Sequence, residues 1–104
     1  MAAHLLILYP QPTDVAAFAK AYHDEHLPYA GPRLTGATAV SSRKVVGPEE
    51  TPPFHFLSDV SFPDLETLQL CARSAGGQEA LAHAASISSG GAPMVLGAVD
   101  ADLP

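Results

Sequence analysis

Along this chain, segments with the apolar spacing of strands alternate with segments that have the apolar spacing of helices. The order of these segments limits the folds that the chain can adopt. His4–Tyr9 is a short apolar run closed by Pro10, which is typical of a buried strand. The next segment has the three- and four-residue spacing of a single helix face, at Val15, Phe18, Ala19, Tyr22 and His26. Pro28 and Pro32 are expected to end this helix, because proline lacks the N–H that a helix interior needs.

The rest of the chain repeats the alternation of strand and helix signals. Three more strands are predicted, at Thr38–Val46, Phe54–Phe62 and Ala92–Val99. A second helix is predicted from Asp64, with Gly76 and Gly77 breaking it and one or two further turns over Gln78–Ala85. The predicted order of elements is therefore β-α-β-β-α-β.

This order predicts an α+β protein with a ferredoxin-like fold, in which helices cover one face of a four-stranded antiparallel sheet. With 104 residues, the chain is expected to form a single domain over residues 1–104. Only 15% of the residues are charged, which leaves few charges to cover a small globule. We therefore expect the uncovered sheet face to pack against a second copy of the chain, in a homodimer.

Charge and composition disfavour several classes of function. Eleven acidic and five basic residues give a net charge of −6, which disfavours contact with the phosphates of nucleic acids. The single cysteine, Cys71, excludes an internal disulfide, and the apolar run Leu5–Tyr9 is far too short to cross a membrane. The sequence has no nucleotide-binding glycine loop and no serine-hydrolase motif. No cofactor and no membrane partner is expected, and the protein is expected in the cytoplasm.

The segment Tyr22–Pro28 (YHDEHLP) is the densest cluster of chemically reactive side chains. His23 and His26 are neighbours on a helix and could share a metal ion, with a third ligand from His55 or from Asp59. Alternatively, His26 could carry a proton near neutral pH, since it lies on the apolar stripe. The helix end favours its cation, whereas burial opposes it. A third interpretation is a packed histidine that bonds to the backbone.

Other polar side chains are candidates for the same site. Asp59 is an acid inside an apolar strand, where an unpaired charge is costly, so it is expected to meet a base or a solvated cleft. Strand alternation places it with His55, opposite three phenylalanines, and leaves open which of these faces meets the helices. If Asp59 shares the side of His26, it could hold the imidazole in one tautomer. The phenols of Tyr9 and Tyr22 could stabilise a developing oxyanion, or could simply pack.

The stretch from Leu5 to Pro28 resembles the opening of the EthD family, named for ethyl tert-butyl ether degradation. That family has a strand ending in Tyr-Pro and a helix ending in an aromatic residue and His-x-Pro, here Tyr22, His26 and Pro28. Residues 62–66 (FPDLE), residues 74–79 (SAGGQE) and Gly97 in the last strand match as well, and in the same order.

This resemblance implies a dimeric α/β barrel, in which two ferredoxin-like chains pair sheet to sheet, with an apolar cleft bordered by His26. We predict a small cofactor-independent enzyme of the isomerase, cyclase or oxygenase type, acting on an apolar aromatic, polyketide-like or lactone substrate. His26 would move the proton, Asp59 would orient the His26 imidazole, and Tyr22 would stabilise negative charge on oxygen. Further substrate contacts are predicted at Tyr9, His23 and His55. The alternative is a non-catalytic accessory or ligand-binding protein that serves an oxygenase in a degradation or biosynthetic pathway.

Overall fold

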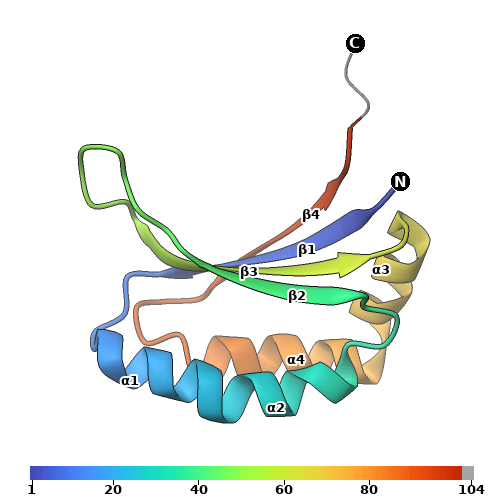
Figure 1. Ribbon diagram of the computed structural model, residues 1–104. Helices are drawn as coiled ribbons and strands as arrows, with labels where there is room; N and C mark the ends of the chain where they lie inside the picture. The colour runs from blue at the N-terminus through green and yellow to red at the C-terminus, as the bar shows by residue number, and fades with distance from the viewer. Residues whose placement is uncertain (102–104) are drawn as a thin grey trace.

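A four-stranded antiparallel sheet lies over a layer of helices in the computed structural model, which describes residues 1–101 (Figure 1). In spatial order the strands are β2 (Ala39–Lys44), β3 (Phe54–Phe62), β1 (Ala3–Pro10) and β4 (Met94–Val99). This arrangement confirms the predicted α+β, ferredoxin-like fold. Residues 102–104 of the predicted domain lie outside the described residues.

The first helix runs further than the sequence indicated and contains a π-helical turn. The segments α1 (Val15–Lys20), η1 (Ala21–His26) and α2 (Leu27–Ala30) follow one another without a break, and the short turn η2 (Gly31–Arg33) ends them. In the π-helical turn, the Leu27 N–H bonds to the carbonyl oxygen of Tyr22, five residues back. Pro28 then stands in the first turn of α2, where a missing N–H costs little. The prediction that Pro28 ends the helix is therefore wrong.

The second helical region consists of two helices, α3 (Leu65–Arg73) and α4 (Ala75–Ser86). The Asp64 carboxylate caps α3 by accepting from the Thr67 N–H at 2.8 Å. Ser74 is extended and caps α4 by accepting from the Gly77 N–H at 3.0 Å. The break thus lies at Ser74, and the prediction of a break at Gly76 and Gly77 is wrong, because both glycines belong to the first turn of α4.

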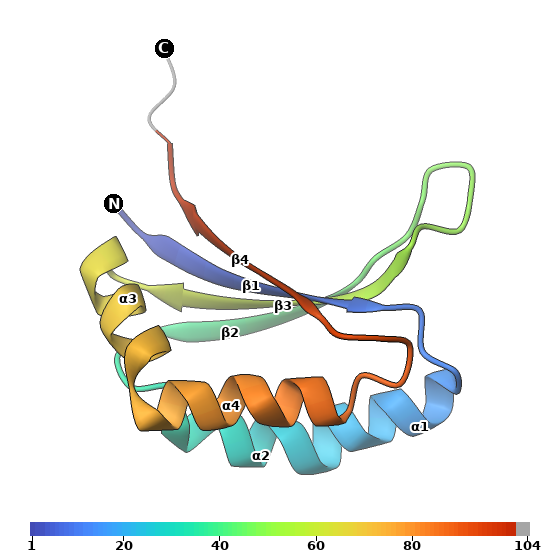
Figure 2. The same ribbon diagram turned by 180° about the vertical axis from the view of Figure 1, so that it is seen from behind.

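Alternation along the strands separates a buried face from an open one. On the helix side, alternate residues of the two central strands are buried: Ala3, Leu5, Ile7 and Tyr9 of β1, and Ser58, Val60 and Phe62 of β3. Phe56 and Phe62 of β3 therefore face the helices, whereas Phe54 lies beyond a shift in register and pairs with Pro10. Seen from behind, the helices again lie on one side of the sheet only (Figure 2).

The open face of the sheet carries a row of apolar side chains. Cross-strand pairs place them together, because residues directly opposite each other share a face. They are Leu6 and Leu8 of β1, Leu57 of β3, and Met94 and Leu96 of β4. The last two are nearly half exposed, at 47% and 46%. Within residues 1–101, no helix is long and apolar enough to span a bilayer.

Two helical glycines should respond oppositely to alanine substitution. A Cβ at Gly77 would meet the Cys71 carbonyl oxygen at 1.9 Å, so Gly77→Ala should lower the free energy of unfolding by about 1–3 kcal/mol. A Cβ at Gly31 meets nothing within 4 Å, so Gly31→Ala should raise it by about 0.4–1 kcal/mol. Urea unfolding of both variants measures this, and equal stabilities would contradict the packing described.

Candidate functional site

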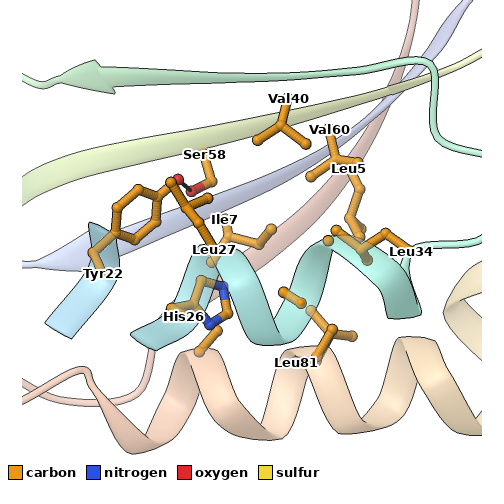
Figure 3. Close-up of a pocket in the computed structure, with 14 residues that line it drawn as sticks. Leu5, Ile7, Tyr22, His26, Leu27, Leu34, Val40, Ser58, Val60 and Leu81 are labelled. Atoms are coloured by element: carbon orange, nitrogen blue, oxygen red, sulfur yellow. Dashed lines mark hydrogen bonds between the residues drawn. The ribbon is translucent and has the colours of Figure 1, made fainter. Parts of the chain in front are cut away.

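A cavity of about 260 Å³ lies between the sheet and the helices (Figure 3). Strand residues close it on one side, with Leu5, Ile7 and Val60 among them, and helix residues close it on the other. Its lining is aliphatic apart from three polar side chains, those of Tyr22, His26 and Ser58. A largely apolar cavity with a few converging polar groups is the usual form of a small-molecule site.

The π-helical turn η1 brings Tyr22 and His26 to the same side of the helix. The two residues are four apart in a turn that is wider than an α-helical one, and both side chains are buried. Their rings pack with centroids 5.6 Å apart. The cluster that stood out in the sequence thus contributes two neighbouring polar groups to the cavity.

The Tyr22 hydroxyl is the centre of a small cluster of three hydroxyls. It bonds to Ser42 Oγ of β2 at 2.7 Å and to Ser58 Oγ of β3 at 2.6 Å. Three hydroxyls carry three protons, and two hydrogen bonds between them use two. One O–H is therefore not used in the hydrogen bonds within the cluster.

His26 is kept neutral by its surroundings. Its side chain is buried and 6% exposed. Burial lowers the pKa of His26 to about 4, and the neighbouring His83 acts in the same direction. Because the helix continues beyond His26, the favourable effect of a helix end is weak here, and burial decides the outcome. At neutral pH the imidazole is a free base.

His83 of α4 is a partner of His26 that sequence reasoning missed. The two Nδ1 atoms lie 2.9 Å apart and the rings are stacked, with centroids 5.1 Å apart. The residues are 57 positions apart in the chain, so no local pattern links them. The only signal is a lone histidine in an alanine-rich helix, where the small Ala80 and Ala84 leave room beside the cavity.

A second, more open cavity of about 380 Å³ adjoins the first, and Tyr22 and Leu27 line both. His23 and His55 lie in its wall, together with Ser42 and Lys44.

His55 reaches this second cavity because β3 has an irregularity. Tyr9 pairs with Phe56 and Pro10 with Phe54, so His55 is an extra residue relative to β1. Its ring packs on Phe18 of α1 at 5.8 Å between centroids. The predicted face that His55 would share with Asp59 is therefore not formed, since the bulge turns His55 to the helix side.

Asp59 lies on the open face of the sheet, away from His26. Its carboxylate bonds to His4 Nδ1 at 2.9 Å and accepts from Arg43 Nη1 at 3.3 Å, while His4 Nε2 bonds to Asp100 at 2.9 Å. The expectation that Asp59 orients His26 has to be corrected, because consecutive residues of a strand point to opposite faces and Ser58 faces the cavity.

Tyr9 does not line either of these cavities. Its side chain is fully buried in the core, with its ring edge-on to Phe18 and Tyr22. Burial, with Tyr22 nearby, raises the pKa of Tyr9, and the nearby Ser58 hydroxyl opposes this rise. The Tyr9 hydroxyl makes no hydrogen bond of standard geometry among the described residues.

The two histidines of the metal interpretation point apart. The His23 side chain is 81% exposed and bonds to Asp24 at 3.0 Å, whereas His26 is buried against His83. Across residues 1–101, no group of three or more His, Cys, Asp or Glu side chains could hold a metal ion.

The fold of the chain is similar to that of EthD proteins, although no family model and no curated protein matches the sequence. An ethyl tert-butyl ether degradation (EthD) family protein from Bacillus halodurans C-125 has a TM-score of 0.84 and 24% identity, over 97% of this chain and 100% of that one. An EthD-like protein from Ralstonia eutropha JMP134 has a TM-score of 0.70 and 18% identity, over 93% and 89%. The predicted resemblance is thus confirmed in the fold.

Two more distant structures show what else shares this fold. A dimeric ferredoxin-like protein of unknown function from Jannaschia sp. CCS1 has a TM-score of 0.63 and 17% identity, over 95% of this chain and 98% of that one. SnoaB, a cofactor-independent oxygenase from Streptomyces nogalater, has a TM-score of 0.61 and 9% identity, over 98% and 94%. Structures with this fold include a described dimer and an enzyme.

Removing the hydroxyl from each buried tyrosine should test the hydrogen bonds described. Tyr22→Phe leaves Ser42 and Ser58 without their shared partner, so the free energy of unfolding should fall by about 1–2 kcal/mol. Tyr9→Phe removes an unpartnered buried hydroxyl and should leave stability unchanged or slightly higher. Thermal and urea unfolding measure both variants. A larger loss of unfolding free energy for Tyr9→Phe than for Tyr22→Phe would contradict the hydrogen bonds assigned to Tyr22.

Proposed function

We propose that this chain is a small cofactor-independent enzyme that transfers a proton on an apolar substrate, with His26 as the base. The observation that carries the proposal is a neutral imidazole in the wall of an aliphatic cavity, with its Nδ1 held by His83. With Nδ1 occupied, the remaining nitrogen, Nε2, is the atom that can act on a bound molecule. The lowered pKa keeps the imidazole neutral at neutral pH, and Nε2 is unprotonated in the tautomer that carries its proton on Nδ1.

The hydroxyl cluster supplies the second element of this chemistry. Removing a proton next to a carbonyl places negative charge on oxygen, which needs a hydrogen-bond donor. Tyr22 and its two serine partners hold one spare O–H where the two cavities meet. Tyr22 thus keeps the predicted role of stabilising oxygen charge, shared with Ser42 and Ser58.

The lining of the two cavities supports the proposed class of substrate. Aliphatic and aromatic walls favour an apolar aromatic, polyketide-like or lactone molecule, which the two compartments of about 260 and 380 Å³ would hold. His23 and His55 would contact its outer part in the second cavity. The cofactor-independent oxygenase of similar fold supports this reading by analogy alone, because a fold does not fix a function.

The alternative is a non-catalytic ligand-binding or accessory protein that serves an oxygenase. One observation favours it: the polar groups in the first cavity already bond to one another or to His83, as they would in a passive binding site.

We also propose that the working unit is a homodimer that forms through the open sheet face. The apolar side chains on this face support the proposal, as does the described dimer of similar fold. The charged groups there are already paired, with His4 between Asp59 and Asp100 and with Arg43 on Asp59. The desolvation penalty of burying a charge is smaller when the charge is paired than when it is free.

Proton abstraction can be measured without the natural substrate. A nitrobenzisoxazole is a suitable probe, because loss of its carbon-bound proton opens the ring and releases a coloured phenolate. His26→Ala should lower kcat/KM for this probe by about 10²-fold or more, since a positioned base contributes roughly that much. Gln69→Ala, at an exposed position of α3 that lines neither cavity, is the control and should keep the rate. Thermal-shift binding of the probe with equal rates in both variants would favour the binding alternative.

The dimer depends on the apolar open face. Leu96→Asp should convert the protein to a monomer, because it places a charge among Leu6, Leu8 and Met94. Leu70→Asp, at a position 58% exposed on α3, is the matched control and should leave the mass unchanged. Light scattering after gel filtration measures both masses. A monomeric wild-type protein would contradict the proposal.

A further inference from the structure

We propose that His26 and His83 form a two-histidine proton relay, in which the buried His26 changes tautomer and the positive charge ends on His83. The inference rests on the proposed function, since it describes how the base of that site handles its proton. His83 does not line the cavity and is a positioning residue that acts through His26.

The geometry of the pair allows only two neutral arrangements. Two Nδ1 atoms 2.9 Å apart form a hydrogen bond only if one carries a proton and the other does not. If His26 carries the proton on Nδ1, its Nε2 is bare and can act as a base. If His83 carries it, His26 must hold its own proton on Nε2 and can act only as a donor. The relay requires the first arrangement at rest.

The transfer then balances in a single step. A C–H or O–H bond of the substrate breaks, its electron pair stays on the substrate, and the proton joins Nε2 of His26. The Nδ1–H bond of His26 breaks and that proton joins Nδ1 of His83, which becomes an imidazolium. His26 ends as the neutral Nε2–H tautomer. It can return this proton to another substrate atom, which is what an isomerase or cyclase needs.

The surroundings explain why the charge should rest on His83. His26 is buried, and burial disfavours its cation, as the lowered pKa shows. His83 is only partly buried and lies in the last turn of α4, where the helix dipole favours a cation. Its ring stacks on Tyr29 of α2, with centroids 4.5 Å apart, and an aromatic face stabilises a cation.

The charged groups around His83 come from each helical segment near it. Glu79 of α4 stands one turn before His83 on the same helix, where a carboxylate supports a cation. Arg33 of η2 lies over the Tyr29 ring at 3.7 Å and would oppose a cation. The Arg33 Nε donates to Glu79 at 3.1 Å, so its charge is largely balanced. The remaining neighbour, His26 of η1, is neutral.

Nitrogen NMR tests the relay directly, because ¹⁵N chemical shifts distinguish the two tautomers and the cation of a histidine. In the wild-type protein at about pH 8, His26 should carry its proton on Nδ1. On acidification, His26 should switch to the Nε2–H form in the same step in which His83 becomes an imidazolium. A His26 already in the Nε2–H form at about pH 8 would overturn the relay. So would a titration of His83 that leaves the His26 signals unchanged.

Two variants separate the relay from simple packing. His83→Gln offers an oxygen that accepts from Nδ1 of His26 but cannot take its proton, so His26 should stay in the Nδ1–H form throughout. His83→Phe keeps the stacked ring without any acceptor and should leave the His26 tautomer unfixed. With the nitrobenzisoxazole probe, His83→Gln should lower kcat about tenfold with KM unchanged.

The rate measurements also keep the two proposals distinguishable. If His26→Ala loses turnover while His83→Gln keeps the wild-type kcat, the relay is wrong and His26 remains the base. If His26→Ala keeps turnover, the proposed function itself is wrong. The NMR result decides the relay in either case, because the coupled tautomer switch is observed without any substrate.

Discussion

The alternation of side chains along β3 is the constraint on which the candidate site and the proposed interface both depend. Ser58 and Asp59 are adjacent in sequence, yet one bonds to Tyr22 inside the cavity and the other to His4 on the open face. Since the helices cover only one face, this alternation assigns each polar residue of β3 to the helix-covered side or to the open side of the sheet. His26 therefore has no carboxylate from β3 beside it, and its hydrogen-bond partner, His83, comes from a helix.

Much of the fold could be predicted from the sequence, because apolar spacing reports directly on which face of an element is buried. The bounds of β3 and the order of strands and helical regions along the chain followed from that spacing. The continuation of the first helix past Pro28 could not be predicted, because it depends on a change of hydrogen-bond ladder within η1. The position of the helix break likewise depends on how Ser74 caps α4, and the two glycines beside it gave a stronger but misleading signal.

The candidate site was less predictable than the fold, and the reasons are physical. His26 and Tyr22 stood out because they share a helix face and lie next to each other in space. His83 did not, since its contact with His26 arises only when two helices pack. The face on which Asp59 lies was left open by the sequence, and its expected contact with His26 does not form. His55 was displaced by a single extra residue in β3, which leaves no trace in the apolar pattern. Sequence periodicity therefore does not predict the contacts of the site that form between elements far apart in the chain.

The pKa values of two histidines on opposite sides of the sheet are shifted in opposite directions, which accords with the proposed active site on one side and the proposed dimer interface on the other. Hydrogen bonds from the His4 imidazole to the carboxylates of Asp59 and then Asp100 raise the pKa of His4, which favours its protonated form between the two acids. Burial lowers the pKa of His26, so this imidazole stays uncharged and free to accept a proton. A fixed, paired charge suits a surface that meets a second protein copy, because it keeps one geometry. A neutral, buried imidazole suits a cavity for an apolar molecule, because it can change its proton without holding a charge there, provided that a neighbour such as His83 takes it.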